Sequence, residues 1–342
     1  MEQPFLSDNV NHFPKTVKDL KRNLFNKNNE SSVSNESIKN VGSKVPMFIN
    51  YIVFNRLGLT IRNLSRILDS DEDFEMHIID SNSKDNSWDY IQSLTDKRIK
   101  SKTRFTLNLG PIYGVNLNLT KRKPEQYFMT IDSDVYIKTK NWISCFMEVF
   151  NTFPDVGILG LMRDNPYPRC MPPIIPKIKG DISYLQLKNA TVDNEMDFIP
   201  GHMQCLRPKL LNEIGYWSEE NGYGDAELSP RVVHYTSFKA GFLTTVEIDM
   251  KQVIGCDECK GREFCTLSRS VNTCFSIGKK SNVNEPFARK ARWKYLESFK
   301  ELKDGKRTAY CASVNDPESM KNHVYNHIWA AENFEYYLIN SN

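Results

Sequence analysis

The chain has 342 residues and carries 45 basic against 42 acidic side chains, a formal net charge of +3. This near balance argues neither for nor against a nucleic-acid partner, and a composition with 40% hydrophobic and 25% charged residues is that of an ordinary globular protein. The longest strongly apolar stretch, residues 47–54, is far shorter than the roughly 20 residues of a membrane helix.

The beginning of the sequence and the cysteines favour a cytoplasmic location. Residues 1–13 have neither a basic n-region nor an apolar h-region, so we expect no secretory signal. Eight cysteines in a long chain without such a signal favour reduced thiols or a metal site over a disulfide framework.

Changes in composition divide the chain into four parts. Residues 1–45 are polar and rich in Asn, Ser and Lys, so we expect a disordered arm, in which residues 15–25 could form a short amphipathic helix. We expect an α/β domain over residues 46–250, a Cys-rich segment over 251–278 and a helical region over 279–342.

The α/β domain is predicted from apolar runs that alternate with apolar residues at helical spacing. The predicted strands cover residues 46–56, 74–80, 104–110, 127–132 and 156–162, and the predicted helices cover 59–69, 85–95, 113–122 and 141–153. Such alternation implies a mostly parallel, Rossmann-like sheet with helices on both faces.

The second half of the chain is less regular. Residues 163–197 are rich in proline, which predicts an irregular loop, and a helix is expected at 226–240. The basic and aromatic stretch 279–307 favours a helix that packs its aromatic side chains on the main domain, with a surface for anionic partners as the alternative. A terminal helix is expected at 323–338.

Carboxylates follow two of the predicted strands. Asp132 ends the strand 127–132 and Asp134 follows two residues later, and Asp80 ends the strand 74–80. In parallel sheets ligands bind at the carboxyl ends of the strands, so these side chains could face one crevice. A carboxylate pair there suits Mg²⁺ or Mn²⁺, which prefer oxygen ligands and share them with phosphates. The alternatives are a solvated Asp-Ser-Asp turn and, for Asp80, a turn former.

Five short motifs, in this order, resemble those of the nucleotide-sugar-dependent glycosyltransferases of GT-A fold. The resemblance is strongest to the large inverting family that includes cellulose and chitin synthases, and it covers roughly residues 46 to 250. Each motif is weak alone, and the ordered set is much more specific. The motifs are VFNR (53–56), DSNSKDNS (80–87), the stretch from NLG to DSDV (108–135), GHMQCLRPKLLNEIGYW (201–217) and GYGDAELSPRV (222–232).

This resemblance implies a metal-dependent transfer of a hexose from a nucleotide sugar, preferably a UDP-sugar, to a hydroxyl acceptor. The implied roles are the backbone near Phe54 and Asn55 beside the base, Asp80 on the nucleoside, Asp132 near the ribose or the metal, Asp134 on the metal and diphosphate, Asp225 as the catalytic base of an inverting displacement, and Glu227 as a neighbour that orients the acceptor or the base. The alternative for Asp225 and Glu227 is a favourably charged helix N-terminus.

The sequence departs from the family pattern in two places. Gly224 stands where many relatives have a glutamate, which leaves the stereochemistry open. The third metal ligand, often a late histidine in relatives, has no clear counterpart; Asp249, His234 or Cys256 could substitute. His202 lies in the strand on the acceptor side and could touch substrate or be structural.

Four cysteines are clustered after the α/β domain. Cys256, Cys259, Cys265 and Cys274 have the spacing C-x2-C-x5-C-x8-C, which favours a structural Zn²⁺ site because C-x2-C is the usual zinc half-site. The second half has unusual spacing, and two disulfides or an iron–sulfur cluster are the alternatives.

The acceptor and the class of activity leave alternatives. The acceptor could be a glycan, a protein or a modified DNA base such as a hydroxymethyl-pyrimidine. A nucleotidyltransferase is disfavoured because no Gly-rich phosphate loop follows the first strand. If Asp225 is not a base, a non-catalytic GT-A-like binding module would fit.

Overall fold

The computed structural model describes residues 45–162, 173–188, 190, 198–222, 224–250, 256–259, 262–270, 273–281 and 284–341. The predicted arm before residue 45, with its short helix at 15–25, lies outside the described residues. Within the described residues, no helix is both long and apolar enough to cross a membrane.

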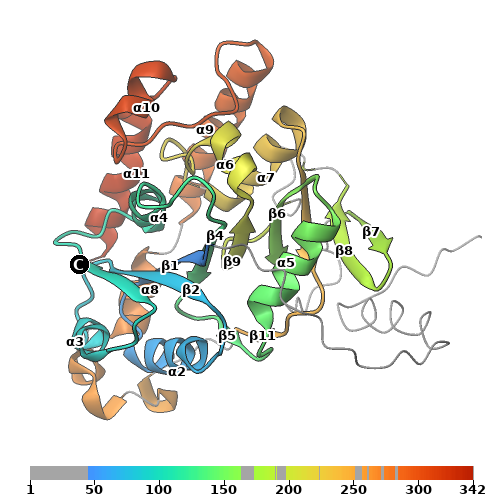
Figure 1. The fold of residues 1–342 in the computed structure, drawn as a ribbon. Helices are drawn as coiled ribbons and strands as arrows, with labels where there is room; N and C mark the ends of the chain where they lie inside the picture. Colours follow the sequence, from blue (N-terminus) through green and yellow to red (C-terminus); the bar gives the residue numbers. More distant parts are fainter. Residues whose placement is uncertain are drawn as a thin grey trace, which may run out of the picture.

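A nine-stranded sheet forms the centre of the protein (Figure 1), in the order β3-β2-β1-β4-β9-β6-β10-β8-β7. Its strands are β1 (Met47–Val53), β2 (Phe74–Asp80), β3 (Ile99–Arg104), β4 (Phe128–Asp132), β6 (Val156–Leu161), β7 (Ile174–Lys179), β8 (Ile182–Leu187), β9 (Met203–Leu206) and β10 (Lys239–Leu243). A separate antiparallel pair consists of β5 (Tyr136–Ile137) and β11 (Ile248–Asp249). From the pairings, β8 and β9 run against the other seven strands, which share one direction. The predicted mostly parallel α/β sheet is confirmed.

Helices cover both faces of this sheet, as predicted. They are α2 (Leu57–Leu68), α3 (Ser87–Ser93), α4 (Pro111–Leu119), α5 (Trp142–Thr152), α6 (Pro208–Ile214), α7 (Gly224–Tyr235), α8 (Cys274–Ser281), α9 (Glu285–Lys303), α10 (Pro317–Asn322) and α11 (His327–Asn340). Alternate residues of a strand point to opposite faces, and in β1 Ile49 and Tyr51 join one apolar core while Phe48 joins the other. Helices α2, α3 and α5 contribute to the first core, and α4, α6 and α7 to the second (Figure 1).

The strand predicted at 104–110 is wrong. The chain pairs with β2 earlier, as β3 over Ile99–Arg104, and it leaves the sheet before Leu107, which is 47% exposed. Strand β3 lies at the edge of the sheet and is half-buried and polar, so it lacks the apolar run by which central strands are recognised. Gly110, with a φ of 87°, then turns the chain into α4.

The irregular loop predicted over 163–197 is also wrong for the part that the structure describes. A hairpin, β7 and β8, forms the other edge of the sheet, and Gly180 in its turn has a φ of 59°. Pro176 is compatible with β7 because an edge strand has one side without ladder partners. The helix predicted at 226–240 ends earlier, at Tyr235, and the following residues form β10 between β6 and β8.

Candidate active site

The predicted nucleotide and metal residues lie together at the carboxyl ends of three adjacent strands. The register pairs Val53 of β1 with Asp80 of β2, and Ile52 of β1 with Asp132 of β4. The loops that follow these strands therefore begin at one level of the sheet, which is where open α/β sheets bind ligands.

The turn after β1 is held to the turn after β2 by side chains. Asn55 accepts a hydrogen bond at Oδ1 from the Lys84 backbone N–H (2.7 Å), and its own N–H donates to Ser83 Oγ (2.8 Å). Asp85 accepts from the Leu57 N–H at 2.9 Å, which also satisfies a donor at the start of α2. Asp85 also accepts from the Ser87 N–H at 3.0 Å and therefore has a structural role in this turn, while Phe54 lies half-buried beside these contacts.

Asp80 has a carboxylate oxygen that the protein leaves unsatisfied. The side chain is fully buried, and Oδ1 accepts from the Ser83 N–H at 3.0 Å and lies 3.6 Å from Arg104 Nε. Among the described residues, Oδ2 has no hydrogen-bond partner. Burial raises the pKa of Asp80, against the lowering effect of Ser83 and Arg104. A buried acceptor without a partner costs free energy, so this oxygen suits a donor on a ligand.

Asp134 likewise has one engaged oxygen and one that is not. Oδ2 accepts from Arg56 Nη1 at 3.0 Å, whereas Oδ1 is buried without a hydrogen-bond partner among the described residues. Asn63 Nδ2 donates to the Ser133 carbonyl at 2.8 Å and fixes the turn between the two aspartates. Burial, then the charge of Asp134 and more weakly that of Asp132, raises the pKa of Tyr51, so both carboxylates lie around this buried phenol.

No three His, Cys, Asp or Glu side chains in the described ranges form a group that could hold a metal ion. Mg²⁺ and Mn²⁺ can bind through one or two carboxylates and complete their shell with water and substrate phosphates. The unsatisfied Oδ1 of Asp134 is compatible with this mode of binding. Asp249, considered above as a third ligand, instead pairs with Arg62 at 2.9 Å.

Asp225 and the aspartate pair are joined through residues 201 and 202. Asp225 lies in the first turn of α7, where Oδ1 accepts from the Ala226 N–H at 2.9 Å and Oδ2 from the Gly201 N–H at 2.8 Å. The next residue, His202, accepts at its carbonyl from the Asp132 N–H at 2.9 Å. The antiparallel strand β9, which starts at Met203, therefore brings the predicted base to the end of β4.

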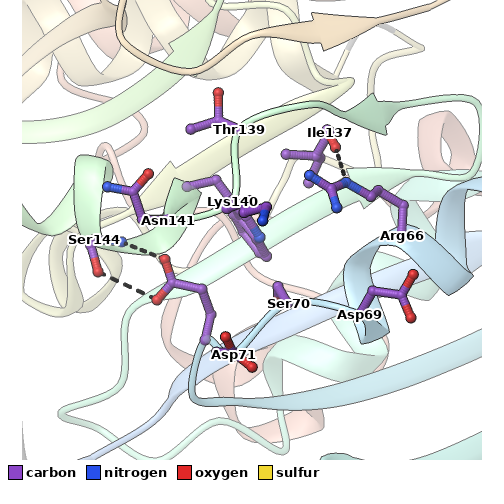
Figure 2. Close-up of a pocket in the computed structure, with 11 residues that line it drawn as sticks. Arg66, Asp69, Ser70, Asp71, Ile137, Thr139, Lys140, Asn141 and Ser144 are labelled. Atoms are coloured by element: carbon purple, nitrogen blue, oxygen red, sulfur yellow. Dashed lines mark hydrogen bonds between the residues drawn. The ribbon is translucent and has the colours of Figure 1, made fainter.

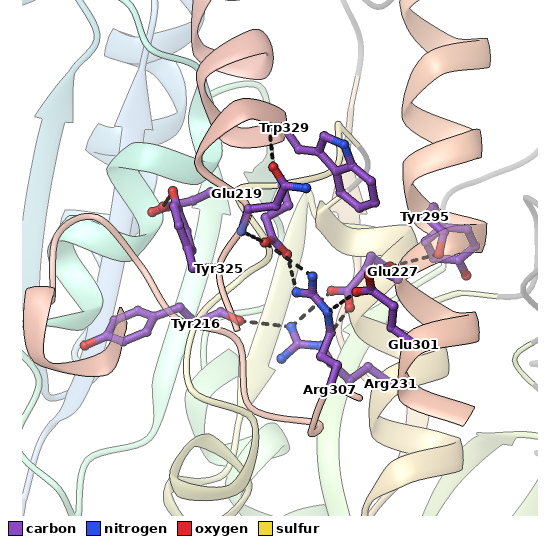
Figure 3. A network of polar contacts seen from close by, with 12 residues as sticks. Tyr216, Glu219, Glu227, Arg231, Tyr295, Glu301, Arg307, Tyr325 and Trp329 are labelled. Atoms are coloured by element: carbon purple, nitrogen blue, oxygen red, sulfur yellow. Dashed lines mark hydrogen bonds and ion pairs between the residues drawn. The ribbon is translucent and has the colours of Figure 1, made fainter. Parts of the chain in front are cut away.

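Glu227 lies in the protein interior. It is 2% exposed and forms an ion pair with Arg231, with 2.8 Å between Oε1 and Nε. Arg231 in turn donates to the backbone carbonyls of Ile214 and Tyr216, and Figure 3 shows the contact with Tyr216. Burial raises the pKa of Glu227.

A second acidic pair, which the sequence reading missed, lies just before α7. Glu219 accepts hydrogen bonds from the side chains of Asn116, Ser313 and Tyr325 and from the Val314 N–H. Glu220 pairs with Arg307 and accepts from the Asn326 N–H. The signal in the sequence was two consecutive glutamates between the apolar Tyr216–Trp217 and the GYGDAEL motif.

These contacts attach the C-terminal helices to the loop before Asp225. Tyr295 of α9 donates to the Ala226 carbonyl at 3.3 Å, and Phe287 of α9 packs on Gly222 so closely that an added Cβ would lie 2.6 Å from its ring. The prediction that the aromatic residues of 279–307 pack on the main domain is confirmed for Phe287 and Tyr295. Trp293 is 51% exposed and packs at its edge on Trp329.

The Cys-rich segment touches the turn after β2. Thr266 donates from its N–H to Asn86 Oδ1 and from its hydroxyl to the Lys84 carbonyl, both at 3.0 Å. Cys256, Cys259, Cys265 and Cys274 are free thiols of intermediate exposure. Burial, with the charges of Asp85 and of the other three thiols, raises the pKa of Cys274 to about 11. These thiols are among the side chains that form no ready metal group, so zinc stays a prediction.

A pocket of about 280 Å³ lies elsewhere, where α2 ends and α5 begins (Figure 2). It is lined by polar residues such as Arg66, Asp69 and Lys140, and none of the predicted site residues lines it. Glu72 in its wall accepts from the N–H of Ser144 at 3.2 Å, near the start of α5, which is a structural role. The predicted site residues therefore lie outside this pocket, in the loops that follow β1, β2 and β4.

The mixed, mostly parallel sheet with helices on both faces agrees with the GT-A-like fold expected from the sequence. Residues 49–215, just under half of the chain, match the sequence model of glycosyl transferase family 2. No curated protein matches the sequence.

Several solved structures resemble between 60% and 87% of this chain at low sequence identity. The mannosyltransferase PcManGT from Pyrobaculum calidifontis, in complex with GDP-Man and Mn²⁺, is 12% identical, with 86% of this chain and 85% of that chain covered and a TM-score of 0.44. S. aureus TarS 1–349 is 15% identical, with 87% and 90% covered and a TM-score of 0.45. GalNAc-T7 with UDP, GalNAc and Mn²⁺ is 14% identical, with 60% and 44% covered and a TM-score of 0.40.

Proposed function

We propose that the protein transfers a hexose from a nucleotide sugar, preferably a UDP-sugar, to a hydroxyl acceptor, with inversion at the anomeric carbon. The observation that carries this proposal is a pair of buried carboxylate oxygens, Asp80 Oδ2 and Asp134 Oδ1, which have no hydrogen-bond partner among the described residues. They lie at the ends of β2 and β4, the two strands that flank β1. Together they offer an acceptor for a nucleoside and an acidic site for a cation, which are the two polar parts of a nucleotide–metal ligand.

On the donor side each residue has a distinct task. Asp80 accepts from the base or the ribose, and the backbone at Phe54 and Asn55 flanks the base. Asp132 and Asp134 hold Mn²⁺ or Mg²⁺, which when bound would stabilise negative charge on the leaving diphosphate.

On the acceptor side Asp225 takes the proton from the attacking hydroxyl. The Gly201 and Ala226 N–H groups donate to its two oxygens, which fixes the carboxylate and favours its charged form. Glu227 is a positioning residue, because its ion pair with Arg231 ties the first turn of α7 to the carbonyls of Ile214 and Tyr216. We propose the acceptor only as a hydroxyl of a glycan, a protein or a modified DNA base.

Zinc in the Cys-rich segment would have a structural task. Cys256, Cys259, Cys265 and Cys274 supply four thiols next to the turn after β2, where Thr266 binds. Because no three thiols in the described segment form a ready group, the segment would have to close around the ion. Such closure would stabilise the nucleotide loop at residues 84–86.

The proposed activity is tested by a donor-hydrolysis screen. Purified protein, Mn²⁺ or Mg²⁺ and a panel of UDP-, GDP-, TDP- and CMP-sugars are incubated with and without chelator, and the released nucleotide is measured. Chelator-sensitive release from one donor establishes metal-dependent transfer and identifies the donor. Release that chelator does not affect overturns the metal assignment, and no release from any donor contradicts the activity.

A further inference from the structure

Arg56 has an unusual place in the donor site. Asn55 and Arg56 are consecutive non-glycine residues with left-handed backbones, at φ 55° and 64°. This conformation costs free energy and persists where surrounding contacts enforce it, often at ligand sites. Here the hydrogen bonds of Asn55 to Ser83 and Lys84 enforce it, and the turn directs the Arg56 side chain toward the end of β4.

The guanidinium of Arg56 lies between the aspartate pair and the Cys-rich segment. Nη1 is 3.0 Å from Asp134 Oδ2, and an added Cβ on Gly278 of α8 would lie 3.7 Å from Nη2. Asp134 is 12% exposed and Arg56 32%, so the pair is shielded from water on the aspartate side and accessible on the arginine side. The arginine can therefore leave its partner without a large rearrangement of the fold.

The charges in the site explain why Arg56 would leave Asp134. Asp132 and Asp134 formally carry −2 and Arg56 +1, so the site has a net charge of −1. A divalent cation on the same carboxylates, bound at Asp134 Oδ1, which has no hydrogen-bond partner among the described residues, would raise this to +1 and place two cations on one carboxylate. The diphosphate of the donor restores the balance, and a guanidinium binds phosphate oxygens in a bidentate manner.

We propose that Arg56 is the counter-ion of Asp134 in the donor-free enzyme and moves to the donor diphosphate once a divalent cation takes Asp134. This inference rests on the proposed function. Arg56 would then weaken metal binding in the donor-free enzyme and strengthen donor binding once the metal is present. If Arg56 had only a structural role, its removal would lower both the affinity for the metal and the affinity for the donor.

The test measures the two affinities separately in wild type and Arg56→Gln. Mn²⁺ affinity without nucleotide is read from the electron paramagnetic resonance signal of free Mn²⁺, and we expect it to rise about three- to tenfold in the variant. The affinity for UDP, and separately for GDP, at saturating Mn²⁺ is measured by calorimetry. For the nucleotide that binds, we expect a loss of about tenfold or more, because charged hydrogen bonds are lost.

Arg62→Gln is the matched control. Arg62 lies on the neighbouring helix α2, is also 32% exposed and pairs with Asp249 at 2.9 Å, so its removal changes the charge equally without touching Asp134. Equal shifts in both variants, no shift, or a fall in both affinities of Arg56→Gln overturns the inference. No Mn²⁺ binding by wild type in the presence of either nucleotide would overturn the proposed donor site as well.

Arg56→Lys covers the case in which Arg56→Gln does not fold. Lysine keeps the charge and loses the planar fork, so we expect Mn²⁺ affinity within about twofold of wild type and weaker nucleotide binding. Unchanged nucleotide affinity in this variant would also overturn the inference.

Discussion

The ion pair between Glu220 and Arg307 allows a direct test of how the C-terminal region supports the loop before Asp225. Arg307 is 5% exposed and Glu220 4%, and Arg307 also donates to Glu301 at 3.0 Å. Arg307→Met keeps much of the side-chain volume and removes the charge. It leaves Glu220 buried with the Asn326 N–H as its remaining donor among the described residues.

The expected loss follows from this geometry. Removal of one partner of a buried ion pair costs about 3–5 kcal/mol because the other charge stays buried. One donor to Glu220 survives and Glu301 is 37% exposed, so we expect the lower end, about 3 kcal/mol. Adding Glu220→Gln removes the uncompensated charge and should recover at least about half of this loss.

Urea unfolding monitored by circular dichroism measures both changes. The control is Lys306→Met, because Lys306 is the neighbouring residue, is 72% exposed and lies 3.9 Å from Asp304. This control should change stability by less than about 0.5 kcal/mol. A loss below about 1 kcal/mol in Arg307→Met, or a double variant no more stable than the single one, would refute the reasoning.

Four further predictions concern the site and the fold. Asp225→Asn should retain nucleotide binding and lose at least about 100-fold in turnover, measured with the donor found in the screen; unchanged turnover would remove its role as base. Asp80→Asn should weaken nucleotide binding about tenfold or more without lowering the unfolding midpoint, because its charged form is already disfavoured by burial; a destabilised variant would make Asp80 a structural residue. Burial lowers the pKa of His77, which stacks on Phe48, to about 4, so the unfolded chain binds more protons between about pH 4 and 6.5, and stability should fall by about 2–3 kcal/mol as the pH drops through this range. His77→Phe should remove this part of the pH dependence, and a profile like that of wild type would contradict the assignment. Metal analysis of purified protein should find about one zinc per chain, and less than about 0.5 equivalent would count against the site.

The central strands and their carboxylates were predictable because burial on both faces leaves a local signature. β1, β2 and β4 are mostly apolar and buried, and Asp80, Asp132 and Asp134 lie at or just after their ends. The two edge strands were not predictable from the sequence, because β3 pairs on one side only and β7 contains a proline. Local apolar patterns carry little information where a strand is half exposed.

The contacts of Glu219 and Glu227 could not be predicted from the sequence, because their partners are far apart in the chain. Glu219 binds Asn116 on one side and Ser313 on the other, separations of 103 and 94 residues. The interior position of Glu227 depends on the same long-range packing of Arg231 against Ala309 and Ile214. A motif can suggest that a glutamate lies near a base, but only the fold decides whether its side chain faces a ligand or the core.

Residues 201 and 202 fix the distance between the proposed base, Asp225, and the end of β4. Gly201 holds the proposed base and His202 holds the end of β4, so two residues of covalent backbone set the spacing between proton acceptor and cation site. Gly201 also leaves little room for variation, since an added Cβ would lie 3.2 Å from Asp225 Cβ and Oδ2. The surrounding loops and helices could therefore differ while the distance between the proposed base and the proposed cation site stays constant.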